Sequence, residues 1–138
     1  MIDKIVGADD ITRYEQARWH LLGTEESTFV LGDSPVVAVG VDGRIGMTAK
    51  YKVENTREVY LPIGPSCVLV AAFHDACPSL GSEQVLAASV RLSRSAFFAD
   101  RDEEGLRSLA KTIGTAEPLL ECPSDEMLRD SWGKMNLD

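Results

Sequence analysis

The sequence predicts an α+β domain in which an antiparallel sheet of about five strands packs against two or three helices. Runs rich in β-branched and aromatic residues, separated by turn formers, occupy residues 27–74 and indicate the sheet. Apolar residues recur at helical spacing in one segment before the sheet and in two segments after it. The dipeptide Asp42-Gly43 is typical of a tight hairpin, and hairpins join antiparallel strands.

Residues 9–22 are expected to form the first helix. One face of it would carry Ile11, Tyr14, Ala17, Arg18, Leu21 and Leu22, which recur every three or four positions. Asp9 or Asp10 can accept hydrogen bonds from the free amides of the first turn, and Gly23 ends the helix. This prediction places Trp19 and His20 on a helix.

The first two strands are expected at residues 28–31 and 36–41, on either side of the turn Gly32-Asp33-Ser34-Pro35. Beyond the hairpin, apolar residues alternate with polar ones from Ile45 to Val53, which predicts a half-buried strand. Residues 58–61 are expected to form a further strand that stops at Pro62. The continuously apolar residues 67–73 are typical of a central strand that is covered on both faces.

Two helices are expected after the sheet. The first begins at Ser82, which can cap it, and runs to about Ala99 with one broad apolar face. Phe98 falls outside that face, so we expect it to contact another element or to lie on the surface. The second spans residues 102–113 and is closed by Gly114. Residues 114–138 are predicted to be an irregular acidic segment with at most one short helix, beginning near Ser124 or Asp125.

The charge of the chain limits the classes of partner. With 22 acidic and 14 basic side chains in 138 residues, the formal net charge is −8. A negative field repels phosphates, so we expect neither a nucleic acid nor an anionic membrane as partner, whereas a basic protein is allowed. Residues 100–138 hold ten acidic and five basic side chains, so the negative charge is concentrated towards the C-terminus.

Length and composition predict one soluble domain over residues 1–138, and its three cysteines favour the cytoplasm as its compartment. Hydrophobic residues make up 44% of the chain and charged residues 26%, which is ordinary for a globular protein. We find no apolar run long enough to span a membrane, and Met1-Ile2-Asp3-Lys4 does not begin a signal peptide. The spacing of Cys67, Cys77 and Cys122 matches neither a paired zinc pattern nor a disulfide framework.

The turns of the sheet resemble those of a bacterial family known as domain of unknown function 4238. Gly32-Asp33-Ser34-Pro35 would occupy the first turn motif of the family, and Pro62-Ile63-Gly64-Pro65 the second. The predicted helix from Gln84 to Ala99 is similar to the closing helix of the family. The resemblance covers residues 25–113 and corresponds to the C-terminal part of the longer members. It implies a fold but no established activity.

Few residues are arranged for catalysis. Gly32-Asp33-Ser34-Pro35-Val36 lacks the last glycine of a nucleophile elbow and leads into a strand, so Asp33 is expected to organise a turn. His74, Asp75 and Cys77 could supply metal ligands or a Cys-His pair, but a metal normally needs three or four ligands and no second cluster is visible. We therefore predict no metal, no cofactor and no catalytic residue.

These observations favour a small acidic protein-binding domain, for example an inhibitor of the immunity type that neutralises a basic toxin or effector. The contact residues would be Phe98, Asp100, Asp102, Glu103, Glu104, Glu121, Asp125, Glu126 and Trp132. The alternative is a hydrolase-like or nuclease-like enzyme, or a remnant of one, with Asp33, Ser34, His74 and Asp75 meeting at strand ends. The two hypotheses differ in geometry, because the enzyme needs Asp33, His74 and Asp75 around one pocket and within hydrogen-bond reach.

Overall fold

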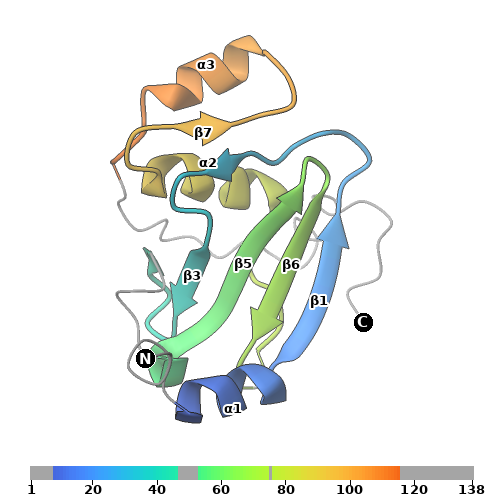
Figure 1. Ribbon diagram of the computed structural model, residues 1–138, viewed down its shortest axis with the longest axis vertical. Coiled ribbons are helices and arrows are strands. Elements are labelled where there is room, and N and C mark those ends of the chain that lie inside the picture. The colour runs from blue at the N-terminus through green and yellow to red at the C-terminus, as the bar shows by residue number, and fades with distance from the viewer. Residues whose placement is uncertain (1–7, 47–52, 75, 116–138) are drawn as a thin grey trace.

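The computed structural model, which describes residues 8–46, 53–74 and 76–115, shows the α+β arrangement that the sequence predicts (Figure 1). A five-stranded antiparallel sheet has the order β1-β6-β5-β3-β4, and a small second sheet pairs β2 with β7. The strands are β1 (Arg18–Gly23), β2 (Leu31–Gly32), β3 (Val37–Gly40), β4 (Ile45–Gly46), β5 (Thr56–Gly64), β6 (Cys67–Ala72) and β7 (Phe97–Phe98). The helices are α1 (Ala8–Gln16), α2 (Ser82–Leu92), α3 (Glu104–Ala110) and the 3-10 turn η3 (Val53–Asn55).

Helices pack against both faces of the large sheet. Alternate residues of the strands, such as Val37, Tyr60 and Val70, form the main core with Val85 and Ala88 of α2. The intervening residues face the other way, where α1 packs across the lower end of the sheet (Figure 1). α3 packs on the side of α2 that faces away from the sheet, in a third cluster built on Val30, Val90 and Leu106.

The prediction of a helix over residues 9–22 is wrong in its second half, since α1 ends at Gln16 and residues 18–23 form β1. In β1 the buried His20 and Leu22 alternate with the exposed Trp19 and Leu21, which is the period of a strand. All six residues of β1 pair with β6, from Arg18 opposite Ala72 to Gly23 opposite Cys67. Pairing with the central strand outweighs the helical spacing here.

The predicted helix over residues 82–99 is also too long, because α2 ends at Leu92. The backbone N–H groups of Arg94, Ser95 and Ala96, which a longer helix would bond internally, donate instead to the carboxylate of Asp33. Phe98 therefore lies on β7 rather than on a helix. At the other end Gly81, not Ser82, precedes the helix as its cap, and its N–H donates to Gln84 Oε1 at 2.9 Å.

Some of the predicted turns and strands are confirmed and others differ from the structure. The hairpin at Asp42-Gly43 is confirmed, with Gly43 at a φ of +82°, and residues 67–72 form a strand between two others. β5 does not stop at Pro62 but continues to Gly64 with a shift of register. Of residues 28–31, only Leu31 lies in a strand, and that strand belongs to the second sheet. Residues 47–52 of the predicted third strand and the short helix near Ser124 lie outside the described residues.

A buried carboxylate joins the sheet to the chain that leads into α2. Glu58 is fully buried, and its oxygens accept hydrogen bonds from Tyr60 Oη at 2.7 Å, from the backbone N–H of Ser79 at 2.5 Å and from Arg57 Nε at 2.6 Å. Ser79 Oγ lies 2.6 and 2.8 Å from the two carboxylate oxygens. Tyr60 Oη in turn accepts from the N–H groups of Ser79 and Leu80. We call Glu58, Tyr60 and Ser79 the carboxylate hub.

We predict that Tyr60→Phe lowers the free energy of unfolding by about 1–3 kcal/mol, because it removes the hydrogen bonds that the buried hydroxyl makes with Glu58, Ser79 and Leu80. Urea denaturation measures this change. Ser89→Ala is the matched control, since Ser89 Oγ is also buried but has no hydrogen-bond partner among the described residues. A loss for Ser89→Ala as large as that for Tyr60→Phe would contradict the role given to the hub.

The same hub predicts a loss of stability in alkali. Burial and the Glu58 carboxylate raise the pKa of Tyr60 well above its ordinary value. The neutral phenol therefore contributes stability in full below the pKa of an unfolded tyrosine, near 10, and that contribution falls as the pH rises further. Denaturation of the wild type between pH 9 and about 11 should show this fall, and the Tyr60→Phe variant should show less of it.

Candidate functional site

The small second sheet displays two apolar side chains to solvent. Leu31 of β2 lies directly opposite Phe98 of β7, so the two side chains share one face of the pair. The exposed fraction of the Leu31 side chain is 46%. That of Phe98 is 69%, which is the highest value among the large hydrophobic residues that the structure describes. We call Leu31 and Phe98 the ribbon surface. The sequence predicted Phe98 as a contact residue but missed Leu31, because only the strand pairing brings the two together.

Asp33 holds this second sheet in place. Its carboxylate accepts hydrogen bonds from the backbone N–H groups of Arg94 at 2.7 Å, Ser95 at 2.9 Å and Ala96 at 3.2 Å, and from Ser95 Oγ at 2.9 Å. These donors, the N–H of Arg94 above all, lower the pKa of Asp33 to about 2. The backbone N–H of Asp33 also donates to the carbonyl of Ala96 at 3.1 Å. Asp33 therefore organises a turn, as the sequence predicts, and the turn joins β2 to the segment before β7.

Gly32 lets β2 lie close to the end of α2. A Cβ atom at this position would be 2.3 Å from Ser93 Oγ and 2.9 Å from the carbonyl oxygen of Ser89. Ser93 Oγ is itself fixed, because it donates to that same carbonyl at 2.7 Å. Glycine is the residue that allows this approach of the backbone.

The predicted acidic contact residues are partly neutralised within the chain. Arg101 contacts Asp100 at 2.9 Å and Glu103 at 3.1 Å, and Arg107 contacts Asp102 at 2.5 Å. Hydrogen bonds from Ser27 and Arg101 lower the pKa of Asp100. Glu104 is exposed and takes part in none of these pairs. The other predicted contact residues, Glu121, Asp125, Glu126 and Trp132, lie outside the described residues.

Of the residues of the enzyme alternative, the structure describes Asp33, Ser34 and His74, and it does not bring Asp33 and His74 together. Asp33 follows β2 at the upper end of the molecule, whereas His74 follows β6 near α1 at the lower end (Figure 1). His74 Nε2 lies 3.1 Å from the carbonyl oxygen of Glu54. Ser34 belongs to the turn at the upper end, and Asp75 lies outside the described residues.

Two of the three cysteines lie in the part of the chain that the structure describes. Cys67 and Cys77 have free thiols, half-buried and exposed respectively. Among residues 8–46, 53–74 and 76–115 there is no group of three or more His, Cys, Asp or Glu side chains arranged to hold a metal ion.

Comparison of the chain with profiles of protein families, with curated proteins and with solved structures finds no match in any of the three. Within the described residues, no helix has the length and apolar character needed to cross a bilayer.

We predict that Gly32→Ala destabilises the protein by about 1–3 kcal/mol, since the added methyl group meets a backbone oxygen that cannot move freely. Gly64→Ala is the matched control, because a Cβ at Gly64 meets no atom within 4 Å. Thermal unfolding of both variants measures the difference. Equal melting temperatures for the two would contradict the close packing of β2 on α2.

Asp33→Asn should lower stability at neutral pH, because the amide loses the charge that the backbone N–H groups of residues 94–96 bind. The folded state depresses the pKa of Asp33, so the wild-type advantage is complete above the ordinary pKa of 3.8 and disappears as the pH falls through about 2. Melting temperatures of both proteins at pH 7, 4, 3 and about 2 test whether the difference in stability between the wild type and Asp33→Asn becomes smaller as the pH falls.

Asp42→Asn serves as the control for this titration, since Asp42 is another exposed turn aspartate whose carboxylate accepts one backbone N–H, that of Arg44. A difference between wild type and Asp33→Asn that stays constant from pH 7 to about 2 would show that the carboxylate charge is not what holds the turn.

Proposed function

We propose that this protein is a binding domain that recognises a basic protein partner through the ribbon surface, Leu31 and Phe98. The observation that carries the proposal is the exposure of Phe98, 69%, on a strand whose neighbouring turn is held by four hydrogen bonds to Asp33. A large aromatic side chain at a fixed position loses little conformational entropy on binding, and aromatic residues are enriched at the centres of interfaces.

Charged residues follow the ribbon surface in the chain and would form the polar rim of an interface centred on it. Asp100, Asp102, Glu103 and Glu104 follow β7 directly, and Arg101 ties this stretch to the carbonyl of Thr28, next to β2. A hydrophobic centre with a charged margin is the usual anatomy of a protein interface. Because Arg101 and Arg107 offset three of these acids, we assign long-range attraction of a basic partner mainly to the net charge of −8 and to the C-terminal acids.

The finer proposal is an inhibitor of the immunity type, acting in the cytoplasm on a basic toxin or effector. Charge complementarity supports it, because opposite charges accelerate association and reject wrong partners. The resemblance of residues 25–113 to domain of unknown function 4238 stays a prediction, and it adds no activity to this proposal.

The proposal is tested by affinity capture with the whole chain from the source organism, followed by calorimetry with the purified partner. We expect Phe98→Ser to weaken binding about 10-fold or more, as for a central interface residue. Ile63→Ser is the matched control, because Ile63 is also an exposed apolar residue, at 56%, and lies on β5 of the large sheet. Binding of this control should equal that of the wild type.

Two results would contradict the ribbon surface as the binding site. One is a partner that binds the Phe98→Ser variant as tightly as the wild type. The other is loss of binding in Ile63→Ser alone, which would move the interface to the end of β5 that carries Ile63.

Charge steering is tested separately by reversing Glu121, Asp125 and Glu126 to lysine. The association rate with the basic partner should fall, and the rates of wild type and variant should converge as salt is added. An association rate that is unchanged at low salt would show that the acidic C-terminal segment does not attract the basic partner.

A further inference from the structure

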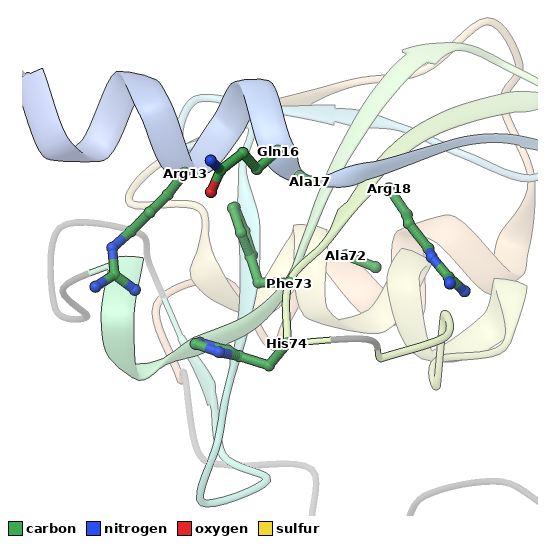
Figure 2. Close-up of a pocket in the computed structure, with 7 residues that line it drawn as sticks. All are labelled: Arg13, Gln16, Ala17, Arg18, Ala72, Phe73 and His74. Carbon is green, nitrogen blue, oxygen red and sulfur yellow. The ribbon is translucent and has the colours of Figure 1, made fainter.

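A second candidate site lies at the opposite end of the molecule from the ribbon surface. A cavity of about 250 Å³ opens between the last turn of α1, the start of β1 and the end of β6 (Figure 2). Its polar lining consists of Arg13, Gln16, Arg18 and His74, so three of its side chains are basic in a chain of net charge −8. Ala17, Ala72 and Phe73 form the apolar part of the wall.

Arg13 and Gln16 are the donors best placed for a ligand. They lie three residues apart on α1 and therefore project from neighbouring positions of one helix face. Figure 2 shows both on the same side of Phe73 as the imidazole of His74, whereas Arg18 extends on the other side, beside Ala72. Among the side chains that the structure describes, Arg13 forms no ion pair.

His74 forms the opposite wall of the cavity in a fixed orientation. Its φ of +56° is the only positive value at a described residue other than glycine. Its Nε2–H donates to the carbonyl oxygen of Glu54 at 3.1 Å, which sets the direction of the ring. Strained backbone of this kind persists where the surrounding structure determines it, and such positions cluster at ligand sites.

We propose that this cavity binds a small organic monocarboxylate, with the carboxylate on Arg13 and Gln16 and the apolar body against Phe73. A guanidinium matches a carboxylate in a two-pronged geometry, and an adjacent aromatic wall favours a ligand with an apolar part. The net charge of −8 repels anions at long range, and it repels a doubly charged phosphate more than a singly charged carboxylate. The site is independent of the protein-binding function proposed above.

The experiment titrates sodium benzoate into the isotope-labelled whole chain and follows the backbone amide signals of Ala17 and Phe73 by NMR. We expect saturable shifts at these signals, and a dissociation constant about 10-fold higher in Arg13→Gln. Arg94→Gln is the matched control, since Arg94 is an exposed arginine at the other end of the molecule, and it should bind benzoate like the wild type. His74→Asn tests the wall with a residue that tolerates positive φ, and we expect it also to weaken binding.

Several outcomes would overturn the proposal. Benzoate could give no saturable shift, or it could bind Arg13→Gln as tightly as Arg94→Gln. A parallel titration with inorganic phosphate separates the ligand classes, and saturable binding of phosphate alone would reject the carboxylate. Arg13 can also complement the carbonyl groups at the end of α1. A lower melting temperature of Arg13→Gln with unchanged benzoate affinity would assign it only that structural role.

Discussion

The burial of one carboxylate constrains the arrangement of the whole molecule. Glu58 is inaccessible to water, and a charge in that position is tolerated only if donors surround it. Those donors come from two places in the chain: Arg57 and Tyr60 on β5, and Ser79 just before α2. Satisfying Glu58 therefore fixes where the chain leaves the sheet and begins its main helix, which is a stronger demand on geometry than apolar packing alone makes.

The placement of the ribbon surface follows from the placement of α2. Gly32 packs against Ser89, in the last turn of α2, and against Ser93, which follows the helix. The backbone immediately after Ser93 supplies the three N–H groups that Asp33 binds. Leu31 and Phe98 thus lie on a sheet that is held to the C-terminal end of α2, and the segment before α2 is joined to Glu58 through Ser79. The two candidate sites lie at opposite ends of this frame, so a partner at one leaves the other accessible (Figure 1).

The fold class and the central strand could be predicted because they depend on local patterns: turn residues, apolar runs and the Asp42-Gly43 hairpin. The predictions were wrong where contacts between residues far apart in the sequence determine the secondary structure. Residues 18–22 satisfy helical spacing but pair with β6, and the helix after Ser82 stops early because Asp33, about sixty residues before it, captures three of its N–H groups. The exposure of Phe98 could be anticipated, because Phe98 fell outside the apolar face of the expected helix. Leu31, Arg13 and Gln16 gave no signal, since their significance depends on which elements meet in space.

A double-mutant cycle on Glu58 and Ser79 tests most directly the claim that the carboxylate hub fixes α2 on the sheet. The free energies of unfolding of Glu58→Gln, Ser79→Ala and the double variant are compared with that of the wild type in urea. The account predicts that the two substitutions are coupled by about 1 kcal/mol or more, because each removes a partner of the other. Effects that add to within about 0.3 kcal/mol would show that the two residues act independently. This result would contradict the claim that the carboxylate hub fixes α2 on the sheet.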